Sequence, residues 1–159
     1  MSTLRVSLCI TALATVLTAS AFAQAPPSPS PAKRAIDERK AIFTLVGSNF
    51  RPIGEQLQGR GSLDAGEARK RAERLVFLSS LAGDAFSDIS NVGEPGTRAK
   101  AEIWSQRADF DKALADFVKH SQALAQTAAT QAPGSDAFKA AAGAVAQDCK
   151  GCHDTFRGK

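Results

Sequence analysis

Residues 135–157 read SDAFKAAAGAVAQDCKGCHDTFR. Ser135 is a good N-cap for a helix, and the carboxylate of Asp136 in the first turn suits the positive end of the helix dipole. Behind these two residues, apolar side chains recur three or four positions apart, the spacing of a helix that buries one face. The segment predicts an amphipathic helix with these buried positions: Phe138, Ala142, Val145, Cys149, Cys152 and Phe156.

Three earlier stretches of the chain show the same helical spacing. They cover about residues 33–58, from 62 or 64 to 90, and 98–130. Pro52 lies inside the first stretch and predicts a kink or a local break near Asn49, because proline lacks the backbone N–H of a helix interior. The intervening segments are rich in glycine or proline. With no strand-like alternation, the sequence predicts an all-α fold, an antiparallel four-helix bundle.

The first residues of the chain resemble an export leader. Residues 6–17 are mostly apolar, and Ala21-Phe22-Ala23 offers the small residues that a signal peptidase reads. A membrane-spanning helix needs about 20 apolar residues, and this run is shorter and interrupted by hydroxyl side chains. We therefore expect a signal peptide at residues 1–23, a Pro-rich disordered tether at 24–32 and one domain at 33–159. These features predict a periplasmic protein without a membrane anchor.

Composition excludes several classes of function. The formal net charge is +4, and loss of Arg5 with the leader lowers it to +3. Lysines and arginines are scattered among acidic residues, with no basic block interleaved with aromatics, so nucleic-acid binding is not indicated. The sequence also lacks the acid, base and nucleophile set of a hydrolytic enzyme. We expect a protein that is not an enzyme.

The pentapeptide Cys149-Lys150-Gly151-Cys152-His153 has the form C-x-x-C-H, the signature of covalent haem attachment. Two thiols three positions apart on a helix lie on the same side and can add to the two vinyl groups of one porphyrin. The neighbouring imidazole can then ligate the iron from one face of the ring. The motif predicts a haem c whose metal ligand is His153.

Other chemistries of a C-x-x-C pair fit this chain less well. A thioredoxin-like redox pair belongs near the start of a helix in a mixed sheet fold, whereas this pair ends a helix in an all-α chain. A zinc site would need a fourth ligand, and the sequence offers only His120 in addition to His153. A disulfide across two residues would close a tiny loop and add little stability.

The sixth coordination position of the iron separates a simple electron carrier from a gas-binding protein. The chain has one methionine, Met1, which leaves with the leader, so the commonest second ligand is absent from the mature chain. His120 could border the core, but a boundary histidine bonded to water or a backbone carbonyl is the simpler interpretation. We expect a five-coordinate iron facing an apolar wall, open to nitric oxide or carbon monoxide.

Three segments together resemble the cytochrome c-prime family, the class II c-type cytochromes, which attach haem close to the C-terminus of a four-helix bundle. They are CKGCHDTFR at 149–157, RKAIF at 39–43, and AKAEIW at 99–104 followed by Phe110. The resemblance spans residues 39–157. The haem motif is common to all c-type cytochromes, whereas its combination with the other two segments is much more specific.

The resemblance implies roles for four residues beyond the haem motif. Phe43 covers the vacant face of the iron, where related low-spin members place methionine. Arg39 lies near a haem propionate, with a surface charge as the alternative, and Arg157 brings positive charge to the His153 side of the haem. Trp104, the only tryptophan, packs against the porphyrin edge or simply fills the core. Members often form homodimers through their first two helices.

These observations predict a periplasmic cytochrome with high-spin haem c that exchanges electrons with redox partner proteins. Nitric oxide binding or detoxification remains open. Two alternatives also remain: a dedicated gas-binding or sensing haem protein, and a low-spin electron carrier that uses His120 or a lysine as sixth ligand.

Overall fold

The computed structural model describes residues 28–159, so the predicted leader and residues 24–27 of the predicted tether lie outside the described residues. Four long helices run through the described part: α1 (Pro31–Leu57), α2 (Ala65–Leu81), α4 (Arg107–Thr130) and α5 (Asp136–Phe156). Shorter turns occupy α3 (Glu102–Ser105), η1 (Asp84–Phe86) and η2 (Asp88–Asn91). The all-α prediction is confirmed.

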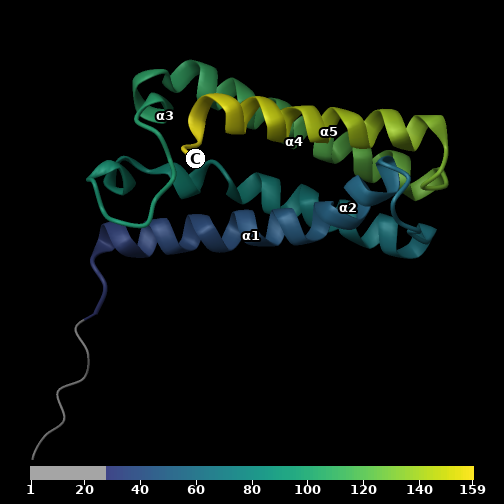
Figure 1. Cartoon of the computed structure of the whole chain (residues 1–159), viewed down its shortest axis with the longest axis horizontal. Coiled ribbons are helices and arrows are strands. Elements are labelled where there is room, and N and C mark those ends of the chain that lie inside the picture. Colours follow the sequence, from purple (N-terminus) through teal and green to yellow (C-terminus); the bar gives the residue numbers. More distant parts are fainter. Residues whose placement is uncertain (1–27) are drawn as a thin grey trace, which may run out of the picture.

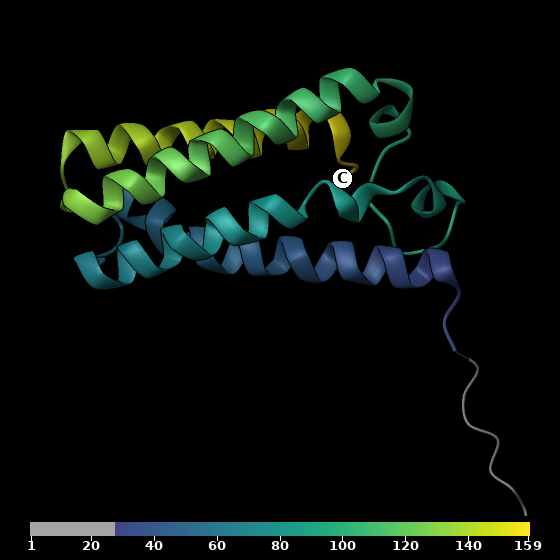
Figure 2. The same ribbon diagram turned by 180° about the vertical axis from the view of Figure 1, so that it is seen from behind.

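The four long helices form two layers. Figure 1 shows α1 and α2 side by side in one layer and α4 and α5 in the other, and Figure 2 shows the same layers from behind. Helices that follow one another in the chain run in opposite directions, and α2 also packs on α4. The short turns and the end of α5 gather at one end of this antiparallel bundle. None of the described helices is both long and apolar enough to cross a membrane.

The buried apolar residues form two clusters. The larger one fills the middle of the bundle with side chains of α1, α2, α4 and α5, including Ile53, Leu75, Leu124 and Val145, each fully buried. The smaller one lies where the short turns meet α4 and α5, and its members are Ala85, Phe86, Ile103, Phe110 and Phe156.

The predicted helix boundaries are wrong in two places. The second helix ends at Leu81 instead of continuing to residue 90, because the following segment, rich in Gly, Asp and Ser, forms 3₁₀ turns. The third long helix begins at Arg107 instead of near residue 98. Residues 98–100, before α3, pair with the end of α5 through hydrogen bonds from the Lys100 N–H to the Phe156 carbonyl, 3.0 Å, and from the Gly158 N–H to the Arg98 carbonyl, 2.7 Å.

The break predicted at Pro52 is absent, because α1 continues through it to Leu57. Pro52 cannot donate a hydrogen bond to the carbonyl of Ser48, one turn earlier in the helix. Instead, that carbonyl accepts a hydrogen bond of 3.1 Å from Nη1 of Arg71 on α2. A side chain from the neighbouring helix thus satisfies the group that proline leaves without a partner.

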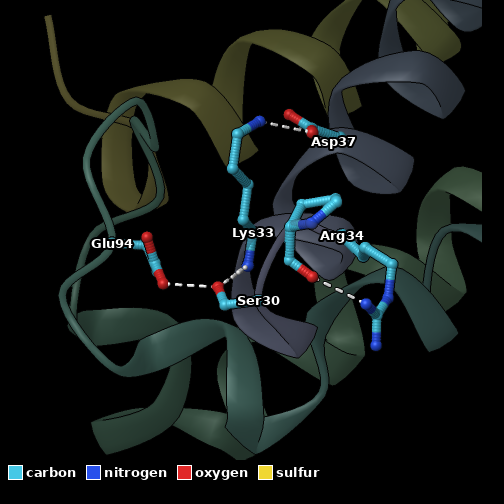
Figure 3. Close-up of polar contacts among 6 residues, drawn as sticks. Ser30, Lys33, Arg34, Asp37 and Glu94 are labelled. Carbon is cyan, nitrogen blue, oxygen red and sulfur yellow. Dashed lines mark hydrogen bonds and ion pairs between the residues drawn. The ribbon is translucent and has the colours of Figure 1, made fainter. Parts of the chain in front are cut away.

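The start of α1 is tied to the loop that precedes α3. Ser30 is the N-cap: its Oγ accepts from the Lys33 N–H at 3.1 Å and donates to Oε1 of Glu94 at 2.6 Å (Figure 3). Arg34 donates to the Pro29 carbonyl at 2.7 Å, and Lys33 pairs with Asp37. The helix begins two residues earlier than residue 33, because Pro31 has the backbone angle that a first helical position needs.

Replacing Pro52 by alanine tests the role of Arg71. We expect Pro52→Ala to raise the free energy of unfolding by about 1 to 3 kcal/mol, since the new N–H bonds to the Ser48 carbonyl within the helix. Arg71→Met should cost about 1 kcal/mol in the wild-type background. In the Pro52→Ala background that cost should largely disappear. Urea denaturation of the four proteins measures this cycle.

Arg69→Met is the matched control, because Arg69 has only an exposed ion pair with Glu73. Arg69→Met should lower the free energy of unfolding by the same small amount in the wild-type and the Pro52→Ala backgrounds. If Arg71→Met lowers the free energy of unfolding equally in these two backgrounds, the role assigned to the hydrogen bond from Arg71 to the Ser48 carbonyl is contradicted.

Candidate functional site

An apolar cavity of about 620 Å³ opens between α1, α4, α5 and the segment before α3. Cofactor and ligand pockets in proteins span roughly 300–1,000 Å³, so its size suits a bound group. Six phenylalanines contribute to its lining: Phe43, Phe50, Phe86, Phe110, Phe117 and Phe156.

The last turns of α5 bring the predicted haem-attachment residues to this cavity. Cys149, Cys152 and His153 all line it, and both thiols are half-buried and free. Residues three and four positions apart share one face of a helix, which is why the two sulfurs lie on the same side. The helix therefore presents two thiols and an imidazole to one apolar space.

Burial sets the protonation state of the two thiols. It raises the pKa of Cys149 to about 11, and the nearby carboxylate of Asp148 adds to this rise. The pKa of Cys152 is raised by the same two causes in the same order. Both groups are therefore neutral thiols at physiological pH, which keeps them from reacting as thiolates.

His153 lies at the exposed edge of the cavity beside Arg157. The protein packed around its ring lowers the pKa of His153, and the positive charges of Arg157 and Arg98 lower it further. Nη1 of Arg157 lies 3.4 Å from Nδ1 of the imidazole. These effects favour the neutral imidazole, the form that can coordinate a metal.

Arg39 supplies a buried positive charge at the cavity wall, with only 5% of its surface exposed. Its guanidinium donates to Oγ of Ser90 at 2.9 Å and Oγ1 of Thr97 at 2.6 Å, and lies 5.0 Å from the ring centroid of Phe86. Burial lowers its pKa. Within residues 28–159 it has no carboxylate partner. The alternative of a surface charge is wrong, and a buried cation without a counter-ion favours an anionic group in the cavity.

The wall around Phe43 offers little that could ligate a metal. Phe43 is half-buried and packs edge-on against Phe86, with ring centroids 5.8 Å apart. Lys40 is the one lysine among the residues that line the cavity, and it is exposed. His120 does not line the cavity; its Nδ1 lies 2.7 Å from Oδ2 of Asp148. The partner of this boundary histidine is thus a carboxylate instead of water or a backbone carbonyl.

Trp104 is the one predicted site residue that does not line the cavity. It packs against the smaller core cluster, and its Nε1 is buried with no hydrogen-bond partner among the residues that the structure describes. Its contact with a porphyrin edge stays a prediction. Sequence reasoning missed Ser90, Thr97 and Asp148, because their place at the site follows from turns and helix packing.

The donor set fits an iron porphyrin. Two neutral thiols and an imidazole lie on one wall, aromatic side chains line the space, and a buried guanidinium without a counter-ion can receive a carboxylate. The fold and this site together define a c-type haem protein built on a four-helix bundle.

Comparison with known proteins agrees with this class. The sequence model of the cytochrome c' family matches residues 34–157. Cytochrome c' of Rubrivivax gelatinosus is 37% identical over 126 residues, which are 79% of this chain and 95% of that protein. Cytochrome c' of Alcaligenes xylosoxydans is 34% identical over 125 residues, 79% of this chain and 94% of that protein.

Solved structures show the same relationship. Cytochrome c prime from Shewanella frigidimarina superposes with a TM-score of 0.73 at 33% identity, over 83% of this chain and all of that one. The nitric oxide complex of a cytochrome c prime mutant from Alcaligenes xylosoxidans gives 0.70 at 30% identity, over 80% and 97%. The chain belongs to the cytochrome c' family, whose members carry covalently bound haem c.

The raised thiol pKa values predict slow alkylation before haem is attached. On the haem-free chain, iodoacetamide should modify Cys149 about tenfold faster for each pH unit up to about 11, because only the thiolate reacts. In concentrated urea the rate should level off near the ordinary thiol pKa of about 8.5. Since the folded pKa is the higher one, the stability linked to the neutral thiol should be full below about pH 8.5 and decline up to about pH 11.

Mass spectrometry after cleavage at Lys150 separates the two cysteines. Asp148→Asn should speed alkylation of the folded chain, since it removes a negative charge that raises both thiol pKa values. Asp136→Asn, at the far end of α5, should not. Equal rates in folded and urea-unfolded chain would contradict this account.

Proposed function

We propose that Cys149 and Cys152 hold the haem through thioethers and that His153 is its axial iron ligand. The single observation that carries this assignment is that all three side chains line one apolar cavity from the last turns of α5. When bound, the haem supplies an iron that changes between two oxidation states and coordinates small molecules. The protein supplies attachment, orientation and exclusion of water.

A five-coordinate iron follows from the groups that line the rest of the cavity. Phe43 covers the face opposite His153 in this proposal and cannot coordinate. His120 is bonded to Asp148 and does not line the cavity, which argues against it as a sixth ligand. Lys40 is exposed, so its ammonium keeps its contact with water. An apolar wall without a ligand favours a high-spin iron with one open position.

The open position supports electron transfer together with nitric oxide or carbon monoxide binding. An uncharged diatomic molecule enters an apolar cavity without losing strong hydration, whereas anions would. Cytochrome c prime from Alcaligenes xylosoxidans is described with nitric oxide bound, in two variants. Electron transfer between redox partners, with nitric oxide as a ligand and no catalytic turnover, is the function that the site supports best.

Charged residues around the cavity have distinct proposed roles. Arg39 binds a haem propionate, because its buried guanidinium needs an anion. Arg157 holds His153 neutral and brings positive charge to that side of the haem. Lys40, Arg98 and Arg157 are exposed beside the cavity, which favours a redox partner with an acidic surface. Residues 1–23 direct export to the periplasm, where such a partner would meet it.

A homodimer through α1 and α2 is the proposed assembly. Leu45 on α1 and Phe77 on α2 are 51% and 65% exposed, and both border a shallow pocket on the outer face of these helices. Large apolar side chains exposed together on one face indicate an interface. A second copy of the chain can present the same patch in return, as a two-fold interface requires.

Spectroscopy of the purified protein tests the haem proposal. Protein from a host that matures c-type cytochromes should keep its haem after extraction with acidified acetone. Its ferric and ferrous optical and paramagnetic resonance spectra should be high-spin, and nitric oxide and carbon monoxide should change them. Protein that yields only the mass of the bare polypeptide would overturn the assignment.

Phe43→Met tests which face of the iron is open. A thioether at this position should coordinate the iron and convert the spectrum to low-spin, with carbon monoxide binding at least tenfold weaker. Phe43→Leu is the matched control and should stay high-spin. A low-spin wild-type protein that His120→Ala or Lys40→Ala makes high-spin would show that one of these residues is the sixth ligand.

Phe77→Glu tests the homodimer. A charge buried at the interface should turn the dimer into a monomer in analytical ultracentrifugation, with the haem spectrum unchanged. Val92→Glu is the matched control, since Val92 is also 65% exposed but lies in the loop after η2. A monomeric wild-type protein at micromolar concentration would contradict the proposed assembly.

A further inference from the structure

One polar contact joins α4 to α5 beside the haem cavity. Nδ1 of His120 on α4 lies 2.7 Å from Oδ2 of Asp148 on α5. The His120 side chain is 32% exposed and the Asp148 side chain is 13% exposed. The carboxylate is therefore largely shielded from water, whereas the imidazole is still in contact with water. His120 can therefore exchange a proton with solvent, and the resulting change in charge acts on Asp148.

Asp148 carries that charge to the cavity. It lines the cavity directly before Cys149, and among the described residues it is the one acidic side chain that does so. Its negative charge contributes to the raised pKa of both Cys149 and Cys152. The carboxylate is thus close enough to act electrostatically on the two sulfurs to which the haem is attached in the proposed function.

Few other charges face the pair. On α4, Asp116 lies one turn before His120 and is paired with Lys112 at 2.7 Å. Lys119 is the neighbouring cation, and both lysines and His120 act on the Asp116 carboxylate. From α5, Asp148 is the group that meets the imidazole. Lys112 pairs with Asp116 and also acts electrostatically on Asp148, but protonated His120 is the cation in direct contact with Asp148.

We propose that His120 and Asp148 form a proton-linked pair that tunes the reduction potential of the haem; this inference rests on the proposed function. A negative charge at the cavity wall stabilises the ferric iron, which has one more positive charge than the ferrous iron, and so lowers the potential. Protonated His120 offsets that charge and raises the potential. The imidazole is a positioning and tuning group, and it touches neither iron nor substrate.

Charge and proton balance follow directly. With haem bound, an external redox partner would supply one electron, and the fall of one unit in the charge at the cavity would favour uptake of a proton from solvent by His120. By linkage, the proton raises the potential by the same free energy by which reduction favours protonation. Histidine is the side chain whose charge ordinarily changes near neutral pH, which sets the pH range of the measurement.

Redox titration of the holoprotein at several pH values tests the inference. The wild-type potential should fall as the pH rises from 5 to 8. Asp148→Asn should raise the potential most at pH 8 and flatten this dependence. His120→Gln keeps a hydrogen-bond donor to Asp148 but cannot gain a charge, so it should lower the potential at pH 5 and leave it nearly unchanged at pH 8.

Asp136→Asn is the matched control, because it removes an equal charge from the far end of the same helix. It should leave both the potential and its pH dependence unchanged. The imidazole resonances of His120 should also titrate at a higher pH in the ferrous carbon monoxide complex than in the ferric protein. If the contact were purely structural, breaking it would change the melting temperature but neither the reduction potential nor its pH dependence.

Two results overturn the inference while the proposed function stands: a pH dependence that Asp148→Asn and His120→Gln leave intact, or equal potentials for Asp148→Asn and wild type at pH 8. Absence of covalent haem from the wild-type protein is a different failure, because it removes the proposed function itself.

Discussion

Filling an apolar cavity is the constraint on which the rest of this molecule depends. Protein interiors are close-packed, and side chains around an empty space lose their dispersion contacts. Here about 620 Å³ lies between α1, α4 and α5, bordered by six phenylalanines. A covalently attached haem would restore those contacts, and one of its propionates is the proposed partner of Arg39. Attachment at one helix end thus contributes to the packing of the whole bundle.

Hydrogen bonds around the cavity fix the positions of the segments that line it. Hydrogen bonds between the segment before α3 and the end of α5 hold the haem-attachment turn in place. Ser90 and Thr97, from η2 and the following loop, orient Arg39. Ser30 and Glu94 fasten the same loop to the start of α1. Short segments without helical periodicity therefore orient Arg39 and hold the end of α5 in place.

Electrostatics divides the cavity wall into two parts. Arg39, Arg98 and Arg157 bring positive charge to the cavity. Burial, together with Arg157 and Arg98, lowers the pKa of His153 and favours its neutral imidazole. Asp148 brings the opposing charge beside the cysteines, with His120 behind it. An iron whose charge changes by one unit responds to such groups strongly, because the apolar surroundings screen them less than water does.

The sequence by itself determined the presence and order of the four long helices and the haem motif, because helical periodicity and a local five-residue motif are properties of consecutive residues. Only the tertiary structure decided that α2 ends at Leu81, that α1 passes unbroken through Pro52, and that Arg39 is buried. It also decided that His120 meets Asp148, 28 positions away. These outcomes depend on hydrogen bonds and packing between segments distant in the chain, which no local pattern encodes.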